Sequence, residues 1–386
     1  MTQKFHIVNV LTSGVGLADW KLLNIYEREM SIWRNYVSHG WQVTLISSSQ
    51  RDNHTEHEHR KNEGIDLLTL PNQSIARNFL INTNRKKMLR LHSFNRSDRK
   101  PLIIRTNQLS GSHIAYALSG LLQAPLIVRQ GFNAVDNQIR ENGSLHYRSL
   151  CFTAYERRYL QLAALCEFTT HASKESSKSR VSMARDAVIP NFVDTQTWLP
   201  RRNKIRQPRV TMGYFGRVVK EKNLSNLIIA CSRIRNLGLE IIGEGSELTS
   251  LKVLARRTGA AVNFQPRMSA SEVSRQMESW DFMICPSLYE GHPKTIIETM
   301  FKKIPIIGTP VSGISEALGY GKFGFLLPGT SWREIETGIR LVLREPPLRA
   351  AELVNNAYSH ATTNFSVEVI GELQREVYSF LQNKVR

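Results

Sequence analysis

The sequence predicts an α/β protein with mostly parallel sheets, divided into two domains. Apolar runs of strand length alternate with segments of helical periodicity along the whole chain, which is typical of layered α/β folds. At 386 residues the chain is longer than one hydrophobic core usually supports. Residues 201–209, with five basic residues and one proline, interrupt the alternation and are predicted to form a linker.

The first domain is expected over residues 1–200. Short apolar runs rich in β-branched residues supply its strand candidates, and helical patterns lie between most of them. These candidates are residues 5–11, 43–47, 67–70, 102–106, 126–129, 168–170 and 187–189.

The second domain is expected over residues 210–365, where the alternation begins again. Its strand candidates are residues 210–215, 239–242, 262–264, 282–285, 304–307 and 324–327. The last segment, 366–386, contains a helical pattern that is predicted to pack back on the first domain. Because parallel sheets bind ligands at the carboxyl ends of their strands, two such domains are expected to form a cleft.

Composition and charge restrict the class of protein. The apolar content of 41% is ordinary for a soluble protein, but the net charge of +18 is not. It suits nucleic acid, an anionic membrane surface or phosphorylated substrates as partners. The cysteines form no pairwise motif, which favours reduced thiols in the core of a cytosolic protein; they are Cys151, Cys166, Cys231 and Cys285. The apolar run 5–11 is too interrupted for a signal peptide, and no stretch is long enough to span a bilayer.

The segment from Glu290 to Glu298 is the most informative feature of the chain. It follows the apolar run 281–285 and is predicted to open a helix near Pro293, since proline suits a first helical position. The unpaired N–H groups at such a helix end suit a phosphate. Lys294 lies at the wrong end of the helix dipole, which indicates a bound anion.

Two other predicted strand ends carry candidate phosphate ligands. Gly14 and Gly16 follow the first strand, where backbone without Cβ can approach a phosphate, although a plain turn explains them equally well. Gly216 and Arg217 follow the first strand of the second domain, and Lys222 comes shortly after. A guanidinium and an ammonium group at one strand end are suited to phosphate oxygens.

Together these motifs resemble the family 4 retaining glycosyltransferases with the GT-B fold, in which two Rossmann-like domains surround a nucleotide-sugar cleft. The resemblance is to members that build bacterial surface polysaccharides such as lipopolysaccharide and capsule. It covers almost the whole chain and depends on motifs in the family order. They are Gly14-Val15-Gly16, Ile189-Pro190-Asn191-Phe192-Val193-Asp194, Gly216-Arg217 with Lys222, Gly243-Glu244-Gly245, Pro286-Ser287 and the Glu290 to Glu298 element.

The resemblance implies a role for each charged residue of the donor site. Arg217 and Lys222 would hold the donor diphosphate and stabilise its charge in place of a metal ion. Glu298 would accept hydrogen bonds from the ribose hydroxyls, and Glu290 would lie beside the donor sugar. Whether Glu290 is a nucleophile or a stabiliser of positive charge stays open, with hydroxyl contact and charge stabilisation favoured. The departing phosphate oxygen can take the acceptor proton, so no protein base is required.

Departures from the family pattern affect the sugar. His292 and Pro293 stand where many members have Phe-Gly, which puts the sugar preference in doubt. Arg129 stands where many members have a histidine, so Arg129 and Asn133 are predicted sugar or acceptor contacts, with a structural ion pair as the alternative for Arg129. The remaining predicted donor contacts are Gly14, Gly16, Gly216, Glu244, Arg267, Gly291, His292, Pro293, Lys294 and Thr295.

Two polar segments are interpreted separately. His54 and residues 56–59 resemble a metal-ligand set but are predicted to form a solvated loop, because no apolar shell surrounds them. The stretch 84–100 mixes basic and apolar residues. It suits an amphipathic surface on anionic lipid, with an ordinary solvated face as the alternative, and it lacks a recognisable nucleic-acid reader.

The predicted function is a metal-independent, retaining transferase. It moves a hexose-type sugar from a UDP or GDP type donor to a glycan or lipid-linked acceptor, with no cofactor and no nucleic-acid partner. The expected location is the cytoplasm, peripherally on the inner face of the membrane. The alternatives are a nucleotide-sugar epimerase, a soluble disaccharide synthase, or a basic membrane- or nucleic-acid-binding protein on a degenerate scaffold. An NAD dehydrogenase is disfavoured because no Gly-x-Gly-x-x-Gly run follows a strand.

Overall fold

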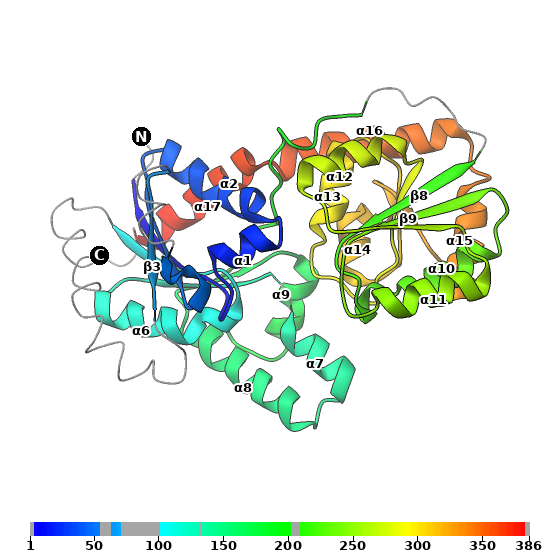
Figure 1. Ribbon diagram of the computed structural model, residues 1–386. Helices are drawn as coiled ribbons and strands as arrows, with labels where there is room; N and C mark the ends of the chain where they lie inside the picture. Colours follow the sequence, from blue (N-terminus) through cyan, green and yellow to red (C-terminus); the bar gives the residue numbers. More distant parts are fainter. Residues whose placement is uncertain (1–3, 55–62, 71–100, 132, 202–208, 383–386) are drawn as a thin grey trace. The chain divides into compact units, whose positions relative to one another are not determined.

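The computed structural model describes residues 4–54, 63–70, 101–131, 133–201 and 209–382 (Figure 1). The chain divides into two compact units. Unit 1 comprises Met1–Pro190 and Val367–Arg386, and unit 2 comprises Asn191–Ser366. Most of the predicted linker, residues 202–208, lies outside the described residues.

Unit 1 contains a seven-stranded sheet in the order β3-β2-β1-β4-β5-β6-β7, and all its paired strands are parallel. The strands are β1 (His6–Val10), β2 (Gln42–Ser47), β3 (Ile65–Thr69), β4 (Leu102–Thr106), β5 (Leu126–Gln130), β6 (Leu165–Phe168) and β7 (Asp186–Val188). The prediction for β6, residues 168–170, was wrong in position. Glu167 interrupts its apolar pattern, yet this carboxylate is buried because it pairs with Arg105.

The helices of unit 1 include the last one of the chain. They are α1 (Leu17–Leu22), α2 (Tyr26–Ser38), α6 (Ser112–Leu122), α7 (Ala134–Asn142), α8 (Tyr147–Leu162), α9 (His171–Lys178) and α17 (Val367–Gln382). Helix α17 packs on α2 (Figure 1). Tyr36 of α2 donates its hydroxyl to Gln374 at 2.6 Å, and Tyr378 of α17 donates to Glu167. These contacts hold the last helix on the first sheet.

Unit 2 contains a six-stranded parallel sheet in the order β10-β9-β8-β11-β12-β13. The strands are β8 (Val210–Phe215), β9 (Leu237–Ile242), β10 (Val262–Gln265), β11 (Phe282–Cys285), β12 (Ile306–Gly308) and β13 (Phe325–Leu326). The helices are α10 (Leu224–Ser232), α11 (Leu248–Thr258), α12 (Ala270–Gln276), α13 (Lys294–Phe301), α14 (Ser312–Ala317), α15 (Trp332–Val342) and α16 (Pro347–Asn364).

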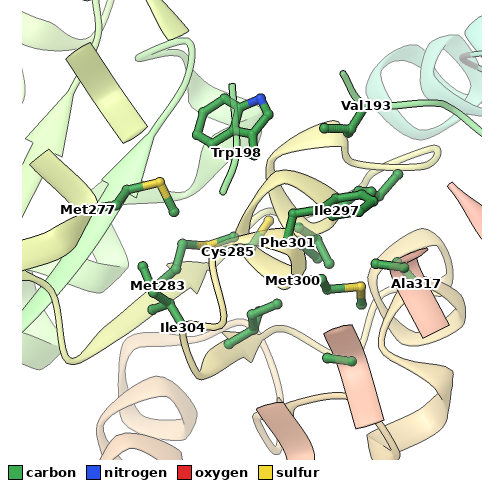
Figure 2. Packing of buried hydrophobic residues seen from close by; sticks show 14 of the residues in the cluster. Val193, Trp198, Met277, Met283, Cys285, Ile297, Met300, Phe301, Ile304 and Ala317 are labelled. Atoms are coloured by element: carbon green, nitrogen blue, oxygen red, sulfur yellow. The ribbon is translucent and has the colours of Figure 1, made fainter. Parts of the chain in front are cut away.

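A dense apolar core fixes β11 and α13 within unit 2 (Figure 2). Ile297, Met300 and Phe301 of α13 are buried in the same cluster as Met283 and Cys285 of β11. Burying one such large side chain stabilises a fold by roughly 1.5–3 kcal/mol. The loop that joins β11 to α13 is therefore held at both of its ends.

Three of the four cysteines are buried in the core, as predicted, and one is not. Cys166, Cys231 and Cys285 are buried, and burial raises the pKa of each thiol to about 12. Cys151 is exposed on α8, so the core prediction was wrong for this residue.

Candidate active site

The loops after β8 and β11 meet at the point where the strand order of unit 2 reverses. Strand β8 pairs with β9 on one side and β11 on the other, so the chain runs outward in both directions from β8. Ligands of open parallel sheets bind outside the carboxyl ends of the strands at such a switch point. The Leu288 N–H, after β11, donates to the Glu221 carbonyl, after β8, at 2.9 Å. The two loops are therefore joined directly.

Lys222 and Glu290 come together at this switch point. The Lys222 Nζ donates to Glu290 Oε1 at 2.5 Å, and the Ser287 hydroxyl donates to the same oxygen at 2.8 Å. The Lys222 and Glu290 side chains are only 15% and 13% exposed. Two residues that the sequence separates by 68 positions thus form one largely buried cluster of cation, hydroxyl and carboxylate.

Asn223 fixes the position of Lys222. It has a left-handed backbone with φ of 56°, and its side-chain amide donates to the carbonyls of Pro286 at 3.0 Å and Thr330 at 2.8 Å. Asparagine tolerates this backbone better than most residues. The short 3-10 turn Lys220–Lys222 is therefore tied to the loop after β11.

Arg217 lies on the same loop as Lys222 but has another partner. Its guanidinium donates to Glu221 Oε1 at 3.0 Å and is largely exposed, whereas Lys222 pairs with Glu290. Glu221 was not predicted as a site residue. An exposed arginine held by one carboxylate can exchange that partner for a phosphate at small cost, since such pairs contribute little to stability.

The glycines beside Arg217 have a packing role. A Cβ on Gly243 would lie 1.9 Å from the Gly216 carbonyl oxygen, and one on Gly245 would lie 2.1 Å from the Val218 oxygen. The turns after β8 and β9 thus touch backbone to backbone. A side chain at Gly243 or Gly245 would clash with this backbone, so the packing alone explains why both residues are glycine.

Glu244 and Arg267, two predicted donor contacts, form an ion pair. The Arg267 Nε lies 3.6 Å from Glu244 Oε2, which joins the segments after β9 and β10. Both side chains reach solvent.

Helix α13 begins one residue later than predicted. Pro293 is its N-cap, with φ of −70° and ψ of 112°, and Lys294 is its first residue. The Lys294 Nζ lies 4.9 Å from the centre of the Phe192 ring, and a cation over an aromatic face is stabilised. The unfavourable dipole position of Lys294 therefore has a compensation other than a bound anion. Glu298, on the same helix, is buried.

The low exposure of Glu290 and Glu298 argues against an ordinary surface role. A glutamate that only complements a helix dipole is normally exposed, whereas Glu298 is buried and the Glu290 side chain is 13% exposed. Buried carboxylates are costly unless paired, so the positions of the two glutamates point to a built polar site.

Thr295, a predicted donor contact, lies in the first turn of α13. Its carbonyl accepts a hydrogen bond from the Thr299 hydroxyl at 2.6 Å.

His292 anchors the loop that carries Glu290. Its Nδ1 accepts the Asn191 N–H at 3.2 Å, and its carbonyl accepts the Asn191 side-chain amide at 2.7 Å. The buried His292 ring meets the Phe365 ring edge-on at 5.2 Å between centroids. A Cβ on Gly313 would lie 1.9 Å from the Gly291 carbonyl oxygen, so backbone from α14 packs against the same loop.

In unit 1 the glycine turn after β1 is occupied by protein groups. Asp52 accepts the N–H groups of Leu17 at 2.9 Å and Ala18 at 2.7 Å, and a Cβ on Gly16 would lie 2.0 Å from Asp52 Oδ2. Gly14, with φ of 75°, donates its N–H to the Ser48 hydroxyl at 3.2 Å. A buried carboxylate disfavours a phosphate here, so the geometry supports the plain-turn alternative.

Arg129 and Asn133 also have structural partners. The Arg129 Nε lies 3.8 Å from Glu167 in the core, beside Arg105, which pairs with Glu167 at 2.9 Å. Burial, with the nearby Arg105 charge, lowers the pKa of Arg129. Asn133 is the N-cap of α7 and accepts the Asp136 N–H at 3.1 Å. The ion-pair alternative for Arg129 therefore has the stronger geometric support.

Asn223 and Asp52 were missed as shaping residues, and Ser287 was named only within the Pro286-Ser287 motif, without a role of its own. Ser287 precedes Glu290 by three positions, which was a usable signal, while Asp52 is distant in sequence from the turn it caps. Within the described ranges, no group of three His, Cys, Asp or Glu residues could hold a metal ion, and no helix is long and apolar enough to cross a membrane. Residues 55–62 and the basic stretch 84–100 lie outside these ranges.

Comparison with known protein families gives a match to the second half of the chain. The sequence model of the family "Glycosyl transferases group 1" matches residues 196–360. The chain carries a group 1 glycosyltransferase domain. This domain contains the whole Lys222, Ser287 and Glu290 cluster.

The curated relatives include a glycogen synthase of Mycobacterium tuberculosis (strain ATCC 25618 / H37Rv). It is 25% identical to this chain over 202 residues, which are 51% of this chain and 49% of the synthase. The putative colanic acid biosynthesis glycosyltransferase WcaL of Escherichia coli (strain K12) is 26% identical over 208 residues, 51% of this chain and 50% of WcaL. The chain thus spans about half the length of the curated relatives it matches.

Solved structures resemble both units of the chain. Sucrose-phosphate synthase from Thermosynechococcus elongatus has a TM-score of 0.79 at 17% identity, covering 97% of this chain and 99% of that one. HepE of Anabaena, solved with UDP and glucose, has a TM-score of 0.72 at 18% identity, with the same coverage of 97% and 99%. At these identities the likeness concerns the fold. It confirms the predicted GT-B fold class of two Rossmann-like domains with parallel sheets.

Proposed function

We propose that this protein is a retaining, metal-independent glycosyltransferase. It moves a hexose-type sugar from a UDP or GDP type nucleotide sugar to a glycan or lipid-linked acceptor, in the synthesis of a bacterial surface polysaccharide. The observation that carries the proposal is the Lys222, Ser287 and Glu290 cluster at the switch point of a group 1 glycosyltransferase domain. The similarity to WcaL supports the polysaccharide setting, and the UDP held by HepE supports the donor class.

The cluster suits the separation of charge in sugar transfer. When the bond between C1 and the phosphate oxygen breaks, negative charge grows on the diphosphate and positive charge on the sugar ring. The Lys222 ammonium stabilises the first, and Arg217, released from Glu221, adds to it. Glu290 contacts the sugar and stabilises the second, with its orientation set by Ser287.

The proton balance requires no protein base. The acceptor oxygen forms the new bond to C1 on the face that the phosphate leaves. Its proton passes to the departing phosphate oxygen, which gains the electron pair of the broken bond. Metal independence is proposed because two protein cations follow β8, where the leaving diphosphate would lie.

A titration without divalent metal tests this function. Thermal stabilisation is measured with UDP, GDP, ADP and TDP and their sugar conjugates, for the unchanged protein and for Glu298→Ala. Stabilisation by one nucleotide family, lost in the variant, is the expected result. No stabilisation by any nucleotide would favour a basic binding protein on a degenerate scaffold.

Product analysis distinguishes the enzyme alternatives. A new sugar epimer formed without acceptor would indicate an epimerase, and transfer only to a free soluble sugar would indicate a disaccharide synthase. The anomeric configuration of the product, followed by NMR, tests retention. Peripheral association with the inner face of the cytoplasmic membrane is part of the proposal, supported by the net charge of +18.

A further inference from the structure

Helix α8 presents an apolar face to solvent. Tyr147, Leu150 and Leu162 are 63%, 52% and 43% exposed, and Cys151 and Ala154 are exposed beside them. Their spacing places these side chains on one side of the helix, because residues three or four apart are neighbours on a helix surface. Arg158 and Gln161 are exposed between Ala154 and Leu162 on the same side, so this face mixes apolar and basic side chains and is a candidate interaction surface.

The inner side of α8 is firmly held, so its exposed face is not the result of loose packing. Glu156, fully buried, accepts hydrogen bonds at 2.9 Å from each of Gln130, Ser177 and Arg180. Helix α8 also packs along α7, and the two form a hairpin (Figure 1). The turn before α8 carries Leu145, which is 87% exposed.

The charges on this surface are of one sign. Arg148, Arg157 and Arg158 are exposed on α8. The structure describes this helix throughout, and its one carboxylate, Glu156, is buried. A second copy docking through the same face would bring arginines against arginines, which disfavours self-association. An anionic surface is complementary to this charge.

We propose that the exposed face of α8, with Leu145 at its leading turn, is the surface by which this protein rests on an anionic membrane. Tyrosine and leucine side chains enter the headgroup region, and arginines reach lipid phosphates while their apolar stems stay in the interface. The 16-residue helix lies flat on the membrane. This inference rests on the membrane association proposed above, and it assigns that association to residues other than the 84–100 stretch.

Vesicle flotation of the full chain tests the charged part of this surface. Binding to phosphatidylcholine vesicles is compared with binding to vesicles that also contain phosphatidylglycerol. Each arginine near an anionic surface contributes about five-fold to partitioning, so Arg157→Gln with Arg158→Gln should weaken binding roughly twenty-five-fold. The matched control is Arg256→Gln with Arg257→Gln, an exposed adjacent pair on α11 with the same loss of charge.

The apolar part is tested by Leu150→Gln with Leu162→Gln, which should weaken binding on the order of ten-fold. Its control is Leu348→Gln, an exposed leucine on α16. Unchanged unfolding temperatures establish that each variant is folded. Binding should also fall as salt is raised, because lipid charge is screened.

Each outcome has a separate meaning. Loss of binding in both α8 double variants, with both controls unchanged, supports the proposal. Anionic vesicle binding that survives these variants overturns the assignment to α8, and binding to no anionic vesicle overturns membrane association itself. Self-association that the leucine variants abolish would also overturn it, in favour of a second copy. Nucleotide titration of the same variants tests the transferase separately.

Discussion

Replacing Lys222 with methionine tests the proposed donor site most directly. The change keeps an unbranched side chain of similar length but removes the Nζ that lies 2.5 Å from Glu290 Oε1. A hydrogen bond to a charged group contributes about 1.5–3 kcal/mol, which corresponds to roughly 10- to 150-fold in nucleotide diphosphate affinity. Glu290, left without its cation, would also repel the diphosphate, so ten-fold is the lower bound. The same unpaired carboxylate should reduce the free energy of unfolding by about 1–3 kcal/mol.

The assay is calorimetric titration with the nucleotide that stabilises the unchanged protein, combined with denaturant unfolding. Lys220→Met is the matched control, because Lys220 belongs to the same 3-10 turn but is exposed. Lys222→Arg keeps the charge and should recover part of the affinity. If Lys222→Met bound the nucleotide as tightly as Lys220→Met, the assignment of Lys222 to the donor diphosphate would be refuted.

Three further predictions concern stability, pH and metal. Glu167→Gln leaves Arg105 and Arg129 buried without an anionic partner and should lower the free energy of unfolding by about 3–5 kcal/mol; a denaturant curve within about 1 kcal/mol of the original would contradict this. Asp186 is partly buried, which alone would raise its pKa, but hydrogen bonds from Lys178 and its neighbour Lys174 lower the pKa below 3.8. Its stabilisation is therefore present at neutral pH and lost as pH falls through the lowered value. Asp186→Asn should reduce the unfolding temperature at pH 7, and by progressively less as the pH is lowered below 3.8; a larger effect at acid pH than at pH 7 would contradict the reasoning. Nucleotide affinity should be unchanged by EDTA, because protein cations are expected to hold the diphosphate, and a ten-fold loss measured by titration would instead indicate a divalent ion.

The sequence was sufficient for most strands because the central strands of both sheets are buried on two faces and appear as apolar runs. The prediction failed where a buried charge broke the run. Glu167 lies in β6, and its burial is possible only because Arg105 from β4 and Tyr378 from α17 surround it. Those partners are distant in sequence, so a local pattern does not contain the information that this glutamate belongs to a strand.

The candidate site could be predicted as separate residues but not as a cluster. Lys222 and Glu290 were identified from the ends of different strands. Their contact follows from the strand order, which sets β8 beside β11, and from Asn223, whose amide links the two loops. The role of Asp52 at the Gly16 turn could not be predicted in the same way. A carboxylate capping that turn comes from a 3-10 segment beyond β2, and only the fold brings it there.

His292 departs from the family pattern, and in the structure it anchors the loop that carries Glu290. In the sequence analysis, His292 and Pro293 in place of Phe-Gly put the sugar preference in doubt. In the structure its Nδ1 accepts the backbone N–H of Asn191, the first residue of unit 2, and its ring contacts Phe365, next to the last residue of that unit. The Val193 N–H also donates to the Phe365 carbonyl at 2.9 Å, so the two end segments of unit 2 are joined where His292 meets them. A phenylalanine at this position keeps the ring contact but leaves the Asn191 N–H without its acceptor. A change at His292 is therefore expected to act first on the position of the Glu290 loop, and only through that position on the choice of sugar.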